Sequence, residues 1–474
     1  MRSLRRLSSV SLLALMLTIG AHPTVAQSRK QKVKKRPQVE VPAAWAGERS
    51  EATTSEAAEL KQWWKTFRDP HLEELVDEAL VSNTDLKIAG ARLNEERAMR
   101  GVANSARYPN VDQTTVIARQ RTVLQTPNAR VPVESGLWQV GFDATWELDL
   151  FGGVRNSVKA ATAEVQAAEE SRRDVLVTLI AEVARSYIEL RGYQRQLEVT
   201  RNNLDTQRDT RDLTAVRAKA GLATDLDVSR AEAQLASTEA SVPELEGLIT
   251  NTSHHLGVLL GKPPGALLAE LQVEQPIPAT TAEVPVGLPA DLLRRRPDIR
   301  RAEAEILAET ARLGVARSEL YPKLELTGLL GRTATSPSGL TLGLGNFFFG
   351  GVGIRFPIFS GGRIRANIRA QDARLDQSIL IYEDTVRHSF EEVENSLTAY
   401  EREREQRTKL EEAVASNRRA VNLSKELYTA GLSDFLSVLE AEKSLYASED
   451  ELAQSDARVS TNLVALYKAL GGGW

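Results

Sequence analysis

Hydrophobic residues recur at three- and four-residue steps along most of this chain, and in a few short stretches the pattern becomes strict alternation. The first periodic run predicts an amphipathic helix that continues towards Tyr108. Its first apolar positions are Leu72, Leu75, Val76, Ala79 and Leu80. We therefore predict a mainly helical chain that contains a small β part.

Two much longer helical tracts follow, and each contains a coiled-coil seam. There is no proline between Pro132 and Pro243 or after Pro357, so nothing breaks a long helix there. An uninterrupted tract of about 65 residues would be roughly 100 Å long. The first seam is Leu176, Ile180, Val183, Tyr187, Leu190, Leu197 and Leu204, and the second is Val386, Phe390, Val393, Leu397 and Tyr400.

Each long tract stops at a glycine and then resumes. Gly221 and Gly431 favour the left-handed conformation that ends a helix. Thr224 and Ser433 are the expected caps of the next helices, and Thr224 forms a capping box with Asp227. Each tract is therefore predicted to end in a tight helical hairpin, far from the strands.

The clearest strand is Trp138–Leu150, in which apolar and polar residues alternate strictly. Its counterpart is 348–358, and the expected partners are 111–121 and 323–331, joined by loops at 122–136 and 332–346. Two interpretations fit: hairpins packed on a soluble core, or membrane strands with an apolar outer face. In the membrane interpretation, Trp138, Phe142, Trp146 and Phe356 face lipid, whereas Asp143, Glu147 and Asp149 line a pore.

Four membrane strands cannot stand alone, because a sheet in lipid cannot leave its edges unpaired. Several chains must then share one barrel. Eight strands make a small barrel filled by side chains, so a conducting pore favours three chains and twelve strands.

The chain is built from two copies of one unit. Motifs such as Tyr108-Pro109 and Tyr321-Pro322 recur in the same order, as do the paired glycines near the long helices. We divide the chain into a signal peptide (1–26), a flexible leader (27–56), a first repeat (57–262, with hairpin 111–150), a linker (263–287) and a second repeat (288–474, with hairpin 323–358).

Composition narrows the function classes. The first residues are basic and the next are apolar, which is typical of a secretory signal. The apolar run is too short for a membrane anchor, so we expect the chain to be exported. The chain has no cysteine, which excludes disulfides, thiol catalysis and a lipid on cysteine. The net charge of −4 gives no sign of nucleic-acid binding. No metalloprotease, nucleophile-elbow or complete P-loop motif occurs, so we expect neither an enzyme nor a cofactor.

Several motifs together resemble the TolC-like outer-membrane factors, in the branch that serves resistance-nodulation-division efflux pumps. They are Trp63-Trp64…Phe67-Arg68-Asp69-Pro70, Asn83-Thr84-Asp85-Leu86, the Tyr-Pro and Gly-Gly elements of both copies, and Leu288-Pro289 followed by Leu-Leu-Arg-Arg-Arg-Pro-Asp-Ile. The resemblance covers essentially the whole mature chain. Many relatives are lipoproteins, but this chain has no cysteine for such an anchor.

The resemblance implies a homotrimer in the outer membrane, with a twelve-stranded barrel continued by a periplasmic α-barrel of long antiparallel helices. It implies an exit duct that passively conducts substrates from an inner-membrane pump and a periplasmic adaptor, and its tips Gly221, Leu222, Gly431 and Leu432 would dock the adaptor. A type I protein secretion channel and a non-conducting periplasmic coiled coil are the alternatives.

The resemblance also points to a periplasmic gate at the second hairpin. Leu436, Glu440 and Lys443 share one helix face, so three copies would form an apolar, an acidic and a basic ring around the pore. The other interpretation is an ordinary solvated face with a weak Glu–Lys pair. Asp227 and Arg230 are the equivalent candidates in the first hairpin, as a secondary latch between helices.

Overall fold

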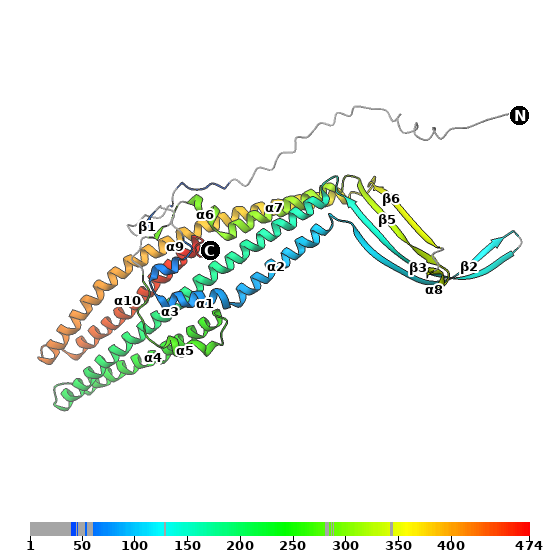
Figure 1. The fold of residues 1–474 in the computed structure, drawn as a ribbon. Coiled ribbons are helices and arrows are strands. Elements are labelled where there is room, and N and C mark those ends of the chain that lie inside the picture. Colours follow the sequence, from blue (N-terminus) through cyan, green and yellow to red (C-terminus); the bar gives the residue numbers. More distant parts are fainter. Residues whose placement is uncertain are drawn as a thin grey trace, which may run out of the picture. The chain divides into compact units, whose positions relative to one another are not determined.

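In the computed structural model, helices α3 and α9 form the framework, and a four-stranded sheet joins their N-terminal ends (Figure 1). The structure describes residues 39–43, 45, 53–54, 60–127, 129–279, 284–285, 287, 289–341 and 345–474. These residues belong to one compact unit, Val39–Trp474. The expected signal peptide and most of the expected leader lie outside the described residues.

The two sequence copies give the same series of elements, except that the second has one additional short helix between its strands. The first copy contains α1 (Pro70–Ser82), α2 (Thr84–Ser105), β2 (Asn110–Thr126), β3 (Ala129–Leu148), α3 (Gly153–Lys219) and α4 (Asp225–Leu259). The second contains α6 (Pro289–Arg295), α7 (Pro297–Ser318), β5 (Lys323–Ala334), α8 (Pro337–Thr341), β6 (Asn346–Arg355), α9 (Arg363–Thr429) and α10 (Phe435–Ala469). Short elements complete the unit: β1 (Thr53–Thr54), η1 (Trp63–Phe67), η2 (Pro264–Leu267), α5 (Leu268–Leu271) and β4 (Val284–Pro285).

Helices α3 and α9 each contain 67 residues, which corresponds to about 100 Å. At their C-terminal ends, α4 packs on α3 and α10 packs on both α9 and α3. At their N-terminal ends, α2 and α7 pack on α3, and α7 also packs on α9. Tight turns around Gly221 and Gly431 join the helices of each hairpin, as the sequence predicts.

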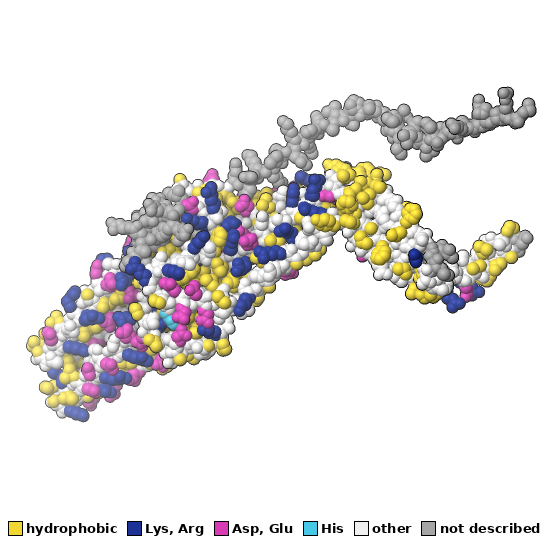
Figure 2. Space-filling model, in the orientation of Figure 1, with side chains coloured by type: hydrophobic (Ala, Val, Ile, Leu, Met, Phe, Trp, Pro, Cys, Tyr) yellow, Lys and Arg dark blue, Asp and Glu magenta, His cyan; other side chains and the backbone are white. Residues whose placement is uncertain are grey.

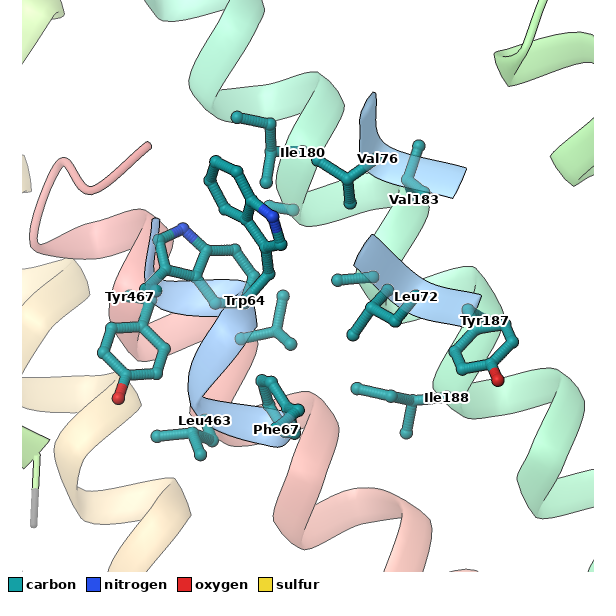
Figure 3. Packing of buried hydrophobic residues seen from close by; sticks show 14 of the residues in the cluster. Trp64, Phe67, Leu72, Val76, Ile180, Val183, Tyr187, Ile188, Leu463 and Tyr467 are labelled. Atoms are coloured by element: carbon teal, nitrogen blue, oxygen red, sulfur yellow. The ribbon is translucent and has the colours of Figure 1, made fainter. Parts of the chain in front are cut away.

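The hydrophobic core lies where η1 and α1 pack against the middle of α3 and the C-terminal half of α10 (Figure 3). Trp64, Phe67 and Leu72 meet Ile180 and Tyr467 there. All but one of the first seam residues are buried, and Leu176 is partly buried. In the second seam Phe390 is partly buried and the other four residues are buried. Both seams therefore form contacts between helices, which confirms the interpretation of their spacing.

The helix expected to run from Leu72 towards Tyr108 is interrupted at Asn83, so this expectation is wrong. The buried Asn83 amide donates to the carbonyl of Leu259 at 2.8 Å, and its Oδ1 accepts from the N–H of Leu86 at 2.9 Å. The backbone of Asn83 leaves the helical conformation and ends α1, and its side chain caps α2 and anchors this junction to the end of α4. The apolar spacing continues across the break, which is why periodicity alone missed it.

The sheet order is β2-β3-β5-β6, and all pairs are antiparallel. The prediction that 122–136 forms a loop is wrong, because β2 and β3 remain paired as far as Thr126 and Ala129. On the N-terminal side of Trp138, at residues 129–137, β2 is the only neighbour of β3 among the described residues. Pro132 can therefore lie on a free strand edge without breaking a ladder. The stretch 263–287, expected as a linker, contains η2 and α5, and its β4 pairs with β1.

Candidate functional site

One face of the sheet is apolar and uncovered. The register places Phe142, Leu330 and Phe348 side by side on β3, β5 and β6. These side chains are 55%, 62% and 86% exposed, respectively. A second apolar row on the same face contains Trp146, Leu326 and Val352, each four residues along its strand from the first row. An exposed apolar surface of this extent indicates contact with lipid or with a partner.

The side chains expected to face lipid belong to this apolar surface or adjoin it. Trp138, Phe142 and Trp146 share the β3 face, because they are four residues apart. The indole of Trp146 also donates to the carbonyl of Arg107 at 3.0 Å, which ties the sheet to the end of α2. Phe356 lies one residue beyond β6 and is exposed.

The opposite face, here called the polar face, carries a row of charges, although Leu329 and Phe349 also lie on it, level with Asp143 in the register. Asp143 accepts from the Thr114 hydroxyl at 2.6 Å, and Glu147 pairs with Lys323 at 3.1 Å. Glu325 lies opposite Glu147 in the register. The sequence reasoning missed Lys323 and Glu325, although the alternation on β5 places both on the polar face.

Asp149 is not on this polar strand face, so that part of the expectation is wrong. It follows the end of β3, and its carboxylate accepts from the backbone N–H of Arg155 at 2.7 Å. The Arg155 guanidinium also contacts it at 3.2 Å. Asp149 therefore fixes the turn between β3 and α3.

The hairpin tips present leucines on rigid turns. Gly221 and Gly431 have φ values of 74° and 75°, and the N–H groups of Leu222 and Leu432 bond back to Arg217 and Leu427 at 2.8 and 2.9 Å. This pattern is a Schellman motif, in which a left-handed glycine closes the helix end. Both following leucines are exposed.

The two hairpins of one chain contact each other at their tips. The Arg217 guanidinium donates to the carbonyl of Thr429 at 3.1 Å and lies 4.5 Å from the ring centre of Tyr428. A small apolar cluster forms beside it, containing Ala231, Tyr428, Phe435, Val438 and Leu439. This contact was not predicted, because the residues are far apart in the sequence.

The predicted gate residues Leu436, Glu440 and Lys443 lie near the start of α10 and are exposed. Asp227 instead completes the capping box of α4 with Thr224, as predicted. The positive charge of Arg230 lies close enough to Asp434 to affect the pKa of its carboxylate. Hydrogen bonds from Ser437, with the positive charge of Arg230 as a smaller cause, lower the pKa of Asp434.

The N-cap of α10 is Asp434, so the expectation that Ser433 caps this helix is wrong. The Asp434 carboxylate accepts from the backbone N–H of Ser437 at 3.0 Å and from its hydroxyl at 2.6 Å. Asp and Ser are both good caps, so the sequence did not decide between adjacent positions.

A buried carboxylate next to the gate face was also missed. Glu442 is 4% exposed, accepts from the Thr210 hydroxyl at 2.6 Å and pairs with Lys425 Nζ at 2.8 Å. It therefore joins α10 to both α3 and α9. Glu440 lies two residues away on a different face of α10 and is exposed.

Among the described residues, no helix combines the length and apolar character needed to cross a bilayer. The same residues contain no group of three or more His, Asp or Glu side chains that could hold a metal ion.

A mainly helical chain with a two-faced antiparallel sheet is the architecture of TolC-like outer-membrane channels, and comparison with solved structures shows this class directly. The outer-membrane channel OprN superposes with a TM-score of 0.86 at 35% identity, covering 93% of this chain and 99% of that one. The open-state MtrE channel of Neisseria gonorrhoeae superposes with a TM-score of 0.80 at 28% identity, covering 93% and 97%.

The chain belongs to the outer membrane efflux protein family, whose model matches residues 75–262 and 288–472. The pyoverdine export outer membrane protein OpmQ of Pseudomonas aeruginosa is 31% identical over 100% of this chain and 98% of its own length. The probable efflux pump outer membrane protein TtgC of Pseudomonas putida is 32% identical over 92% and 91%. The predicted family, helical fold and outer-membrane location are confirmed, and the chain is a channel-type protein and no enzyme.

Proposed function

We propose that this protein is the exit duct of a tripartite efflux system, in which three copies share one twelve-stranded barrel. The observation that carries the proposal is the sheet, with a bare apolar face and a charged opposite face. Its outer strands β2 and β6 each have one edge that pairs with no other described strand of the chain. In lipid those edges must pair with other copies, because unpaired backbone groups in hydrocarbon are costly.

In the assembled duct, the long helices continue the pore into the periplasm and narrow it at the hairpin tips. Leu436, Glu440 and Lys443 are the gate, and Asp227 with Arg230 is the secondary latch. The exposure of Leu436, Glu440 and Lys443 supports the gate role, since gate residues must face the pore and not the chain's own core. Asp143 and Glu147 line the pore within the membrane. Carboxylates in a narrow passage favour cations.

The exposed leucines on the two tips are the docking points for a periplasmic adaptor, which connects the duct to an inner-membrane pump. Relatives carry names such as efflux pump outer membrane protein and pyoverdine export protein. These names favour small-molecule efflux over protein secretion for this chain. Conduction is passive, with energy supplied by the pump.

Two measurements test the duct. The native mass of the protein extracted from outer membranes should be that of a trimer, and the purified protein should conduct ions in planar bilayers. A monomer in that extract contradicts the shared barrel.

The gate is tested with the double variant Leu436→Ala/Glu440→Ala, which should raise single-channel conductance. A matched control is Glu244→Ala/Leu248→Ala, because this exposed pair on α4 has the same residue types and spacing. Unchanged conductance in the first variant, or an equal rise in the control, would reject the gate assignment.

A further inference from the structure

The four junctions between helices and strands lie together along one end of the sheet. Residues 110, 145, 148, 324 and 354 are aligned by the strand register at this end. Neighbouring strands are about 4.8 Å apart, so the four junctions span only about 15 Å. We call this region the junction collar, comprising residues 97–109, 149–160, 312–323 and 355–370.

The junction collar exposes aromatic side chains at every one of its four crossings. Tyr108, Phe151, Tyr321, Phe356 and Phe359 are all exposed. Phe151 and Tyr321 stack with ring centres 4.8 Å apart, which links two crossings. Figure 2 shows hydrophobic side chains gathered where the helices meet the sheet. Such aromatic bands mark the headgroup level in membrane proteins.

The same collar is strongly basic. It contains twelve Lys and Arg residues and two Asp and Glu residues, a net charge of +10 in a chain whose total is −4. All twelve bases are exposed, and nine of them have no ion pair with an acid outside these ranges among the described residues. The other three pair with neighbouring acids: Arg312 with Glu164 and Glu309, Lys323 with Glu147, and Arg355 with Glu325. In Figure 2, dark-blue side chains lie on the helix ends beside the hydrophobic band. Positive charge is therefore concentrated next to the aromatic side chains.

Four of these bases are placed where helix physics disfavours them. Arg155 and Lys159 lie four residues apart near the start of α3, and Arg365 and Arg369 do the same in α9. Like charges at this spacing repel, and bases oppose the dipole at a helix N-terminus. Neither helix has an acidic residue in its first turn. Within the described residues, only Arg155 of the four has an ion-pair partner, which is Asp149.

We propose that the junction collar binds the anionic phospholipids of the periplasmic leaflet of the outer membrane. The aromatic side chains lie at the membrane interface, and the helical bases contact lipid phosphates. Lys159 is six residues beyond the start of α3, or about 9 Å along the helix, which matches the headgroup layer. The proposal rests on the proposed duct, because that function places the helices in the periplasm.

The charge complementarity favours an anionic lipid over a neutral one. Each base near a charged membrane surface contributes to binding, so removal of four should weaken the preference at least about tenfold. The apolar sheet face adjoins the collar and supports the same location, since Leu148, Leu324 and Ile354 form its last row.

The test uses full-length protein extracted from bilayers that contain equal amounts of phosphatidylglycerol and phosphatidylcholine. Native mass spectrometry then measures how much of each lipid stays bound. The test variant is Arg155→Gln/Lys159→Gln/Arg365→Gln/Arg369→Gln. The control is Arg195→Gln/Arg208→Gln/Lys409→Gln/Arg419→Gln, which removes equal charge from exposed positions further along α3 and α9.

We expect the wild type and the control to retain phosphatidylglycerol preferentially, and the test variant to lose most of that preference. Equal retention in test and control would overturn the proposal, and so would a change in ion selectivity of the test variant without a change in lipid. Conductance in neutral bilayers is measured in parallel. If the wild type conducts ions but shows no preference for phosphatidylglycerol, the lipid proposal is wrong and the duct stands. If it retains phosphatidylglycerol preferentially but does not conduct, the duct is wrong and the lipid proposal stands.

Discussion

Replacement of Glu442 by alanine should loosen the second hairpin next to the proposed gate. The carboxylate lies on α10 and holds Thr210 of α3 and Lys425 of α9 at 2.6 and 2.8 Å. Its removal leaves the buried Thr210 hydroxyl and the Lys425 ammonium without these partners. The three helices then lose their shared polar contact.

The size of this effect follows from the two contacts. A hydrogen bond to a buried charged group contributes about 1.5–3 kcal/mol. The Lys425 side chain is 32% exposed, so solvent reduces its ion pair to less than about 1 kcal/mol. The free energy of local opening should therefore fall by about 2–3 kcal/mol, which is a factor of about 30 to 150.

Hydrogen exchange of the backbone amides in 425–442 measures this opening. Glu442→Ala should exchange faster by the factor above, and Glu442→Gln should show a smaller change because its amide still accepts from Thr210. Glu440→Ala is the control, since an exposed side chain away from buried contacts changes stability by less than about 0.5 kcal/mol. Wild-type exchange in Glu442→Ala, or an equal effect in Glu440→Ala, would refute the reasoning.

Three further changes test other parts of the structure. Asp434→Ala should destabilise α10 by about 1 kcal/mol in thermal unfolding, whereas Ser433→Ala should have little effect, and the reverse would restore Ser433 as the cap. Trp474→Ala should lower the free energy of unfolding by about 2–4 kcal/mol. The Trp474 ring lies 4.5 and 5.0 Å from the guanidiniums of Arg173 and Arg300, and its indole N–H donates to the carbonyl of Arg295 at 3.1 Å. An unchanged midpoint of thermal unfolding would contradict this packing. Burial raises the pKa of Tyr187 from 10.0 to about 12, so the contribution of its neutral hydroxyl to stability is present below pH 10 and is lost as the pH rises through 12. Tyr187→Phe should therefore flatten the loss of unfolding free energy over this pH range, and an unaltered slope would contradict the assignment.

The sequence predicted the long helices well, because helix formation over many residues follows from local periodicity and from the absence of proline. The glycine turns were equally clear, since Gly221 and Gly431 adopt a conformation that other residues avoid. Alternation also placed Phe142 and Asp143 on opposite faces of β3.

The errors occurred where local patterns were ambiguous. The stretch 122–136 looks like a loop because it is polar and contains Pro132, but pairing between β2 and β3 continues through it. Asn83 interrupts the first helix without disturbing the apolar spacing, and its side-chain contact with Leu259 depends on the packing of α4. Asp149 continues the alternation of β3 but lies past its end.

The sequence by itself determined which segments become helices or strands and which side chains share a face, because these properties depend on spacings of a few residues. Only the tertiary structure decided which members of a face are buried. Glu440 and Glu442 are two residues apart on α10 and therefore lie on different faces, and Glu442 shares the face of the buried Phe435, Val438 and Leu439. The spacing does not tell whether a carboxylate on that face is enclosed or reaches solvent. Glu442 is enclosed because α3 and α9 bring Thr210 and Lys425 to it, and such contacts between distant segments exist only in the folded chain.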